Sequence, residues 1–226
     1  MHAQLNAVID AFPYLLFGAV NTALIVLTAM GIGLVIGVVV AVGLVYGPGW
    51  LKLLLSAYLW FFRGVPILAL LFLFYFGLFS YLNIQINALA AVAVVLGCTT
   101  GAYQANIFRG AIMSLPRGQF RAASALGMSD AAAIRAIILP QALRISIPAW
   151  SNEYSIILKD SALAFVIGAP EIMARAQFVA SRTYQHLPLY LAAGLLYFLL
   201  TWAGVSALRK LEHKVRIPGY SGEEQT

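Results

Sequence analysis

The sequence predicts an all-α membrane protein with five transmembrane helices, because its charged residues are scarce and unevenly placed. Of its 226 residues, 62% are hydrophobic and 10% are charged, whereas soluble domains carry about 25% charged residues. No Asp, Glu, Lys or Arg occurs from Ala11 to Leu51, a run of 41 residues, or from Gly64 to Phe108, a run of 45 residues. Charge-free apolar runs of this length are typical of membrane spans, so a soluble enzyme and a disordered chain are both excluded.

Turn residues divide these runs into five predicted spans. The first covers about Tyr14–Tyr46 and ends at Gly47-Pro48-Gly49, because neither residue type continues a helix well. The second covers about Leu53–Tyr81 and is interrupted at Arg63-Gly64-Val65-Pro66, and Asn83–Asn87 then form a polar turn. The last three spans cover about Ala88–Ile112, Leu143–Ile167 and Leu187–Leu208.

Glycines in the first predicted span suit close packing between helices. They lie at four positions, Gly31, Gly33, Gly37 and Gly43. Because glycine has no side chain, helix backbones approach closely where it occurs in membranes. We therefore expect close helix contacts along this span.

Basic residues predict the orientation of the chain in the membrane. The connection between the third and fourth spans carries five arginines against one acid, and the tail from about 209 to 226 carries four Lys or Arg, whereas the segment before the first span carries none. Basic residues collect on the cytoplasmic side. We expect a multi-pass membrane protein with its N-terminus outside and its C-terminus in the cytoplasm. The mixed charges of the fourth connection leave room for a short helix on the outer surface.

Clusters of catalytic or metal-binding residues are missing from the sequence. The single cysteine excludes a disulfide framework, and the three histidines do not pair at metal-ligand spacing. The chain has no Gly-x-x-x-x-Gly-Lys-Ser/Thr phosphate loop. We expect no catalytic residues, no metal and no cofactor on this chain, and we attribute its net charge of +6 to the cytoplasmic side rather than to nucleic-acid binding.

The connection of about 113–142 carries the most specific local pattern. Gln119–Leu126 reads as a short alanine-rich helix, and Gly127 suits the left-handed position that ends a helix. Ser129 is a candidate N-cap for a following helix, which Pro140 bends or restarts. These features indicate a rigid docking element, and an ordinary amphipathic surface helix is the alternative.

The same connection resembles the EAA loop of ABC importer permeases. In that family the pattern is Glu-Ala-Ala, then Gly after three residues, then Ile-x-Leu-Pro. The matching residues in this chain are Ala122, Ala123, Gly127, Leu139 and Pro140. Three further stretches resemble segments of the polar amino acid subfamily (histidine, glutamine and arginine uptake systems), namely Phe62–Pro66, Ile107–Ile112 and Asn152–Leu163. The chain departs from the family at Arg121 and Asn106, where glutamates are common, and at Ala69, where glutamine is common.

The resemblance implies a single permease domain over residues 1–226, with the type I ABC importer fold and a cytoplasmic coupling helix. Such a subunit pairs with a second permease subunit, identical or homologous, within the lipid of the bacterial inner (plasma) membrane. It binds two cytoplasmic ATPase subunits, which hold ATP and Mg, and receives an amino acid from a periplasmic or extracellular solute-binding protein. The residues expected to meet the ATPase are Gln119, Arg121, Ala122, Ala123, Leu126 and Gly127.

Glu153 is the first candidate for a substrate contact. It lies nine residues beyond Arg144, and at about 1.5 Å per residue this is roughly 13 Å deeper, near the middle of the bilayer. A carboxylate at that depth is costly and functional by default, so we expect it to bind the ammonium of an amino acid. A structural pairing with a basic residue of a neighbouring helix is the alternative. Asn152 and Trp150 are secondary candidates, with packing as their alternative role.

The break at Arg63, Gly64 and Val65 is the candidate site for the substrate carboxylate. Pro66 can begin a new half-helix whose free N–H groups favour an anion, and transporters bind substrates at broken helices. Arg63 snorkelling towards the headgroups is an equal alternative.

Two other functional classes fit the sequence less well. A secondary transporter or channel for a small zwitterionic solute needs an ion-coupling carboxylate or an inverted repeat, and five spans do not divide into equal halves. A membrane enzyme needs a Ser/His/Asp or metal cluster, which is missing.

Overall fold

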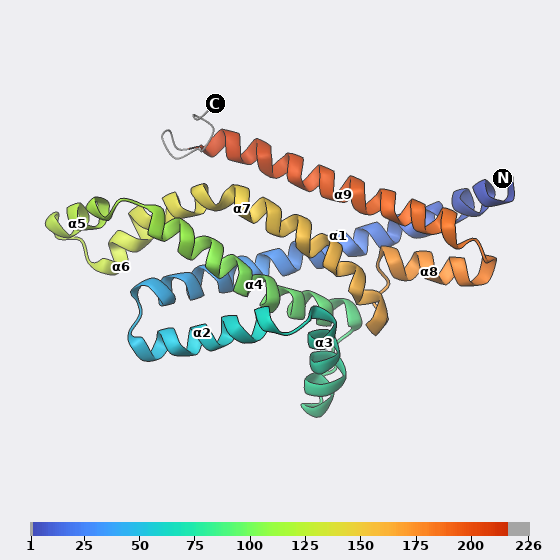
Figure 1. Ribbon diagram of the computed structural model, residues 1–226, viewed down its shortest axis with the longest axis horizontal. Helices are drawn as coiled ribbons and strands as arrows, with labels where there is room; N and C mark the ends of the chain where they lie inside the picture. The colour runs from blue at the N-terminus through green and yellow to red at the C-terminus, as the bar shows by residue number, and fades with distance from the viewer. Residues whose placement is uncertain (1, 217–226) are drawn as a thin grey trace.

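The computed structural model describes residues 2–216, and every regular element in that part of the chain is a helix. The four longest helices run along the long axis of the molecule (Figure 1): α1 (His2–Tyr46), α4 (Ala88–Ser114), α7 (Leu139–Asp160) and α9 (His186–Val215). The start of α1 and the end of α9 lie towards opposite ends of this axis (Figure 1). An odd number of spans requires this arrangement.

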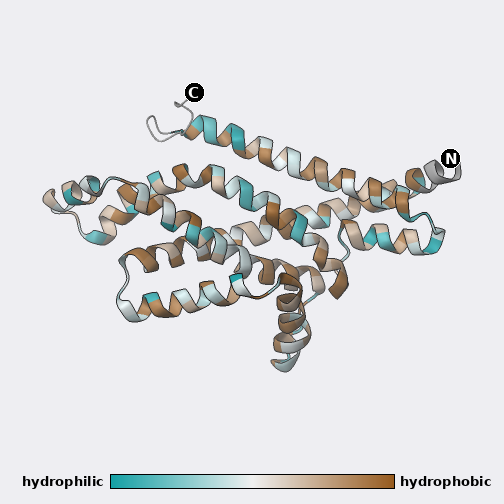
Figure 2. Cartoon of the chain, viewed as in Figure 1, coloured by the Kyte–Doolittle hydropathy of each residue, from teal (hydrophilic) through white to brown (hydrophobic). Residues whose placement is uncertain are grey.

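Four of the five predicted spans are confirmed as continuous helical stretches, and the second is present only as a bent pair of helices. Among the described residues, four helical stretches are long and apolar enough to cross a membrane: Val8–Tyr46, Ala88–Ser114, Asp130–Ile167 and His186–Val215. Helix α2 (Gly49–Gly64) and the segment Ile67–Phe79 form a fifth span only as a pair, bent by 107°. Figure 2 shows apolar residues over these helices and hydrophilic ones at the connections.

The break in the second span is sharper than the interruption that the sequence predicts. Helix α2 ends at Gly64, and Pro66 is the N-cap of α3 (Ile67–Phe72), which continues as the π-helix η1 (Leu73–Phe79). Proline has no N–H and cannot continue the ladder of α2. Helix α3 therefore turns away from the bundle instead of extending α2 (Figure 1).

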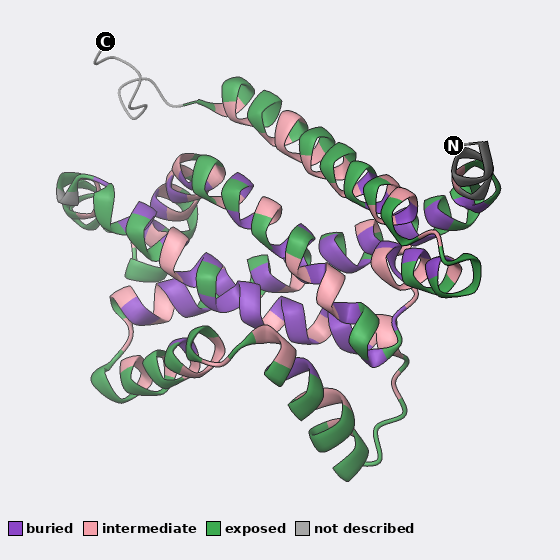
Figure 3. Ribbon diagram, turned by 45° about the vertical axis from the view of Figure 1, so that its right-hand side comes forward, coloured by how far each residue is buried: buried purple, intermediate pink, exposed green. Residues whose placement is uncertain are grey.

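Helices α1 and α4 form the most extensive contact of the fold. A Cβ added at Gly33 would lie 2.5 Å from Gln104 Nε2, and one added at Gly37 would lie 2.8 Å from Gln104 Cβ. Nothing lies within 4 Å of such an atom at Gly31. The expected close packing is therefore confirmed at Gly33 and Gly37, and Gly31 lies outside the contact. A Cβ added at Gly43 would lie 2.5 Å from Leu55 Cδ1 of α2, so close packing is confirmed there as well. Figure 3 shows that the buried residues concentrate on α4 and the middle of α1.

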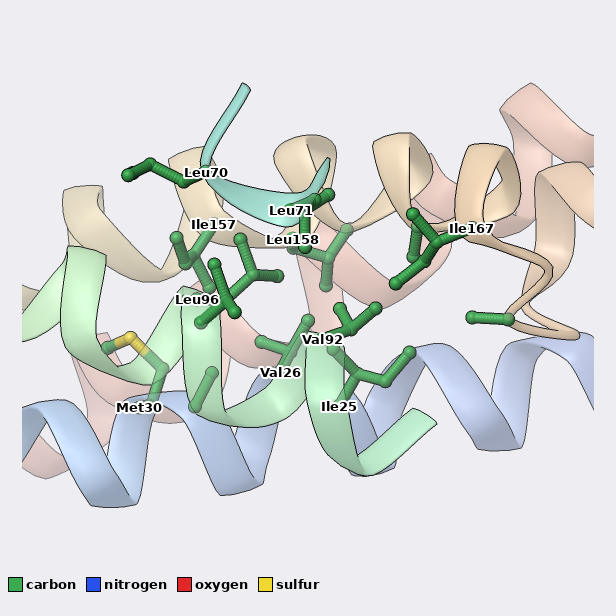
Figure 4. Packing of buried hydrophobic residues seen from close by; sticks show 14 residues of the cluster. Ile25, Val26, Met30, Leu70, Leu71, Val92, Leu96, Ile157, Leu158 and Ile167 are labelled. Carbon is green, nitrogen blue, oxygen red and sulfur yellow. The ribbon is translucent and has the colours of Figure 1, made fainter. Parts of the chain in front are cut away.

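One apolar cluster joins α1, α3, α4, α7 and the 3₁₀ segment η3 (Ser161–Ile167) near the break of the second span (Figure 4). Because the partners belong to five different segments, this cluster holds the bent span against the bundle. Its largest members include Val26, Met30, Leu70, Leu71, Leu96, Ile157 and Leu158.

The connection between α4 and α7 is helical almost throughout. It contains α5 (Arg117–Ala125), α6 (Asp130–Ala133) and the π-helix η2 (Ile134–Ile138). Ser129 Oγ accepts a hydrogen bond from Ala132 N at 3.3 Å, which confirms it as the N-cap of α6. The π-turn immediately before Pro140 accommodates the proline, so helix α7 continues through it.

The expected short helix in the fourth connection is also present. Helix α8 (Ile172–Thr183) follows the 3₁₀ segment η3 (Ser161–Ile167). Its N-cap, Glu171, is fully buried and accepts hydrogen bonds from Met173 N at 2.8 Å, from Ala174 N at 2.6 Å and from the Tyr197 hydroxyl. Burial raises the pKa of the Glu171 carboxyl, although these three hydrogen bonds lower it. The side of the membrane on which α8 lies stays a prediction.

We predict that Gly37→Ala destabilises the protein while Gly31→Ala does not. The new methyl at position 37 would press on Gln104 Cβ at 2.8 Å and on Ala105 N at 3.1 Å, atoms fixed by α4 itself. Overpacking of this kind costs about 1–3 kcal/mol. At Gly31 the space is open, so alanine adds only its helix propensity, up to about 1 kcal/mol of stability. Thermal unfolding in detergent should show a lower Tm for Gly37→Ala alone, and equal Tm values would contradict the proposed contact.

Candidate functional site

Glu153 lies at the end of a hydrogen-bonded chain that crosses from α7 to α4. Trp150 Nε1 donates to Gln104 Oε1 at 2.7 Å, Gln104 Nε2 donates to Thr100 Oγ1 at 3.2 Å, and Thr100 Oγ1 donates to Glu153 Oε1 at 2.6 Å. Thr100 and Gln104 are fully buried, and Glu153 is 4% exposed. Gln104 Nε2 also donates to Met30 O of α1 at 3.4 Å. The network therefore joins α7, α4 and α1, and its last member is the Glu153 carboxyl group.

The Glu153 carboxylate is only partly satisfied within this chain. Its one hydrogen-bond partner among the described residues is the neutral hydroxyl of Thr100, and its second oxygen, Oε2, accepts none from them. The structural pairing with a lysine or arginine, which was the alternative from sequence, is not formed within the described chain. Because a carboxylate within a membrane span is costly unless it is paired, this oxygen is a suitable acceptor for a cationic or donor group from outside the described chain.

The break at the end of α2 lies beside the same part of α4. The Arg63 guanidinium lies 5.3 Å from the ring centroid of Tyr103, which directly precedes Gln104 in sequence. Arg63 and Gly64 are exposed, and Val65 is half-buried. The predicted components are thus on neighbouring segments, but the structure records no contact between Arg63 and Glu153.

Asn152 is not brought together with Glu153. It is exposed, because consecutive residues of a helix point about 100° apart.

Asn106 has an unpaired side-chain amide. It occupies a position where the family that the sequence resembles commonly has glutamate. Its Nδ2 is buried without a hydrogen-bond partner among the described residues. The exposed Asn152 amide is therefore available to groups outside this chain, whereas Asn106 Nδ2 is an unsatisfied donor inside it.

Sequence reasoning missed the two central members of the network, Thr100 and Gln104. They are spaced four residues apart within a charge-free span, which places them on one face of a helix. A polar pair on one face of a membrane helix was the available signal.

The coupling loop ends its first helix with a hydrogen-bonded turn around Gly127. Met128 N donates to Ala123 O at 3.1 Å, and Gly127 N donates to Ser124 O at 3.0 Å, which is the pattern of a Schellman motif. Gly127 has φ +79°, which confirms the predicted left-handed position. The loop is consequently a rigid cap and protrudes at one end of the molecule (Figure 1).

The expected coupling residues divide into an exposed set and an inner set. Leu126 is 82% exposed, and Arg121 and Ala122 are also exposed. Ala123 is 1% exposed, so its side chain packs within the chain. The Gln119 amide exchanges two hydrogen bonds with Gln141 of α7, at 3.0 and 2.8 Å. The first set is available to a partner, whereas the second fixes α5 on α7.

These features define a class of protein: a membrane transport subunit with a partly satisfied carboxylate inside its bundle and a rigid helical loop at one end. The chain belongs to the family of binding-protein-dependent transport system inner membrane components, whose profile matches residues 33–217.

Individual relatives agree with this assignment. The probable amino-acid ABC transporter permease protein YckA of Bacillus subtilis is 37% identical over 190 residues, which cover 84% of each chain. The histidine/lysine/arginine/ornithine transport system permease protein HisM of Salmonella typhimurium is 33% identical over 210 residues, which cover 89% of each chain.

Solved structures give the same fold. A crystal structure of an amino acid ABC transporter with histidines matches with a TM-score of 0.81 and 32% identity, covering 91% of this chain and 96% of that one. An inward-facing structure of the MetNI methionine ABC transporter has a TM-score of 0.78 at 21% identity, covering 91% and 98%; at this identity the likeness concerns the fold alone. The chain therefore has the type I ABC importer permease fold that its sequence predicts.

We predict that Gly127→Ala impairs the coupling of transport to ATP hydrolysis, whereas Gly118→Ala does not. A Cβ meets nothing within 4 Å at either position, but only Gly127 has a positive φ. A side chain in the left-handed region costs about 1–2 kcal/mol, so the turn and the direction of the loop should change. The measurement is substrate taken up per ATP hydrolysed by the assembled complex in proteoliposomes. An unchanged ratio for Gly127→Ala would contradict a rigid loop.

Proposed function

We propose that this chain is the permease subunit through which an ATP-driven importer moves a polar amino acid into the cytoplasm by alternating access. Family membership and amino acid transport by its relatives support the proposal. The observation that carries it is the Glu153 carboxylate, which is buried in the bundle and has one neutral partner and one unpaired oxygen.

Glu153 is the proposed acceptor for the ammonium of the substrate. Its Oε2 is free to accept a charge-assisted hydrogen bond, and such bonds are roughly twice as strong as neutral ones. The donors from Thr100 to Trp150 hold the carboxylate in place from the other side. A zwitterion also needs donors for its carboxylate, and we assign these to Arg63 and the adjacent backbone at Gly64 and Val65. The exposed amide of Asn152 is available to the substrate or to a second subunit.

Continuous helix supports a mechanical link between the coupling loop and Glu153. Asp130–Ile167 is a single spanning stretch of α6, η2, α7 and η3. Its N-cap, Ser129, directly follows the docking turn, and Glu153 lies 24 residues farther along, about 36 Å at 1.5 Å per residue. Movement of the loop would tilt this rod and shift Glu153 against Thr100 of α4. Such a shift would open the carboxylate, which the present conformation encloses.

The partners complete the transporter. We propose a second permease subunit, identical or homologous, and two cytoplasmic ATPase subunits that bind ATP and Mg and contact the exposed Leu126 and Ala122. A periplasmic or extracellular solute-binding protein would deliver the amino acid at the opposite end, near α8.

With the ATPase subunits at the loop end and the binding protein at the α8 end, the N-terminus lies outside and the C-terminus lies in the cytoplasm. Residues 217–226 of the predicted tail lie outside the described residues. No comparison supports the alternative of a secondary transporter or channel.

We predict that Glu153→Gln raises the substrate concentration needed for half-maximal uptake, whereas Glu212→Gln does not. The substitution keeps the shape and the Thr100 contact but removes the charge. Loss of a hydrogen bond to a charged group costs about 1.5–3 kcal/mol, or roughly ten- to hundredfold in affinity. Glu212 near the end of α9 supplies a chemically identical control outside the network. Uptake is measured in proteoliposomes containing the complete complex and its binding protein.

Two outcomes would contradict the proposal. A normal concentration dependence for Glu153→Gln would remove this residue from the substrate site. Uptake by this chain without an ATPase subunit and without ATP would exclude the importer function itself.

A further inference from the structure

A cavity beneath the coupling helix is separate from the Glu153 network. Its volume is about 810 Å³, within the range of roughly 300–1,000 Å³ typical of ligand pockets. Its walls come from the end of α1, the end of α4, α5 and Ile138 of η2. It therefore lies where the spanning helices end and the docking loop begins.

The cavity combines an apolar wall with two positive charges. Arg109 of α4 and Arg121 of α5 both line it, and no Asp or Glu does. Neither guanidinium has a recorded carboxylate partner among residues 2–216, and both side chains are exposed. Tyr46 and Phe120 stack at 5.8 Å between ring centroids, and Leu44 and Met113 extend the apolar surface.

Like charges that share one cavity are unfavourable unless an anion lies between them. The family that the sequence resembles commonly has glutamate at the position of Arg121. The cavity wall of this chain therefore carries a positive charge where an acidic residue is usual. A small free anion would satisfy the guanidiniums and leave the apolar wall in contact with water. An occupant that satisfies both parts of the cavity has an anionic head and a hydrocarbon chain.

We propose that this cavity binds one anionic phospholipid of the adjacent leaflet, with its phosphate on Arg109 and Arg121 and an acyl chain along the wall formed by Leu44, Met113 and the Tyr46–Phe120 pair. Arginine binds phosphate oxygens in a bidentate manner. Basic pockets between the ends of transmembrane helices bind lipid headgroups in the same way. Because α5 forms one wall, the bound lipid ties the coupling helix to the ends of α1 and α4.

The test measures lipid binding to the assembled transporter directly. The complex, in neutral detergent, is titrated with short-chain phosphatidylglycerol, and bound lipid is counted by native mass spectrometry. Removal of both charges in the Arg109→Gln/Arg121→Gln variant should weaken binding about thirtyfold, since each basic residue near a membrane surface contributes about a factor of five. The matched control, Arg135→Gln/Arg144→Gln, removes two exposed arginines that do not line the cavity and should change affinity less than twofold.

Two further arms separate headgroup charge from the other parts of the ligand. Phosphatidylcholine of the same chain length should bind at least about tenfold more weakly, and glycerol phosphate without chains should not be retained. Arg109→Lys/Arg121→Lys keeps the charge and should recover most of the binding, which distinguishes lost charge from a folding defect.

Several results would overturn the inference. Equal binding of phosphatidylcholine would show that charge is not recognised, and retention of glycerol phosphate would indicate a free-anion site. Unchanged phosphatidylglycerol binding by Arg109→Gln/Arg121→Gln would place the lipid elsewhere. Exclusion of lipid by the docked ATPase, seen as binding only to the permease freed of ATPase, would assign the cavity to the protein partner.

Discussion

The close contact between α1 and α4 is the constraint on which the rest of the structure depends. In a membrane the lipid is as apolar as the side chains, so helices associate through packing and polar contacts rather than through exclusion of water. Gly33 and Gly37 of α1 admit α4 at a distance that no side chain would tolerate. This approach encloses Thr100 and Gln104 between the two helices, and α7 then packs across them with Glu153. The polar network is thus a consequence of the glycine contact.

The second organising element is the rod from α6 to η3, because it carries both the docking loop and the carboxylate. Its π-turn before Pro140 keeps the helix continuous where a proline would otherwise disrupt it. The paired amides of Gln119 and Gln141 fix α5 on this rod. A force on the exposed tip at Leu126 therefore reaches α7 through hydrogen-bonded contacts rather than through a flexible linker.

Features set by local rules could be predicted from the sequence, and features set by tertiary contacts could not. The spans follow from charge-free runs, the left-handed Gly127 from the pattern around it, and the cap at Ser129 from its side chain. Pro66 marks the break, but the size of the 107° bend goes with the packing of α3 against α4 and η3, which no local pattern encodes. Likewise, Thr100 contacts Glu153 across 53 residues of sequence, so only the fold identifies the pair.

The charged side chains discussed above lie at different places along the molecule. They differ in how many hydrogen-bond or charged partners the described chain provides for them. Glu171 receives three hydrogen bonds and is closed off, which suits a structural cap. Glu153 receives one and keeps an unpaired oxygen, which suits a site that a ligand must enter and leave. Arg109 and Arg121 have no recorded carboxylate partner within the described chain. For Glu153 the absence of a charged partner within the described chain is costly at membrane depth, whereas the exposed Arg109 and Arg121 are hydrated and available to an anion. Both places therefore suit molecules from outside the chain.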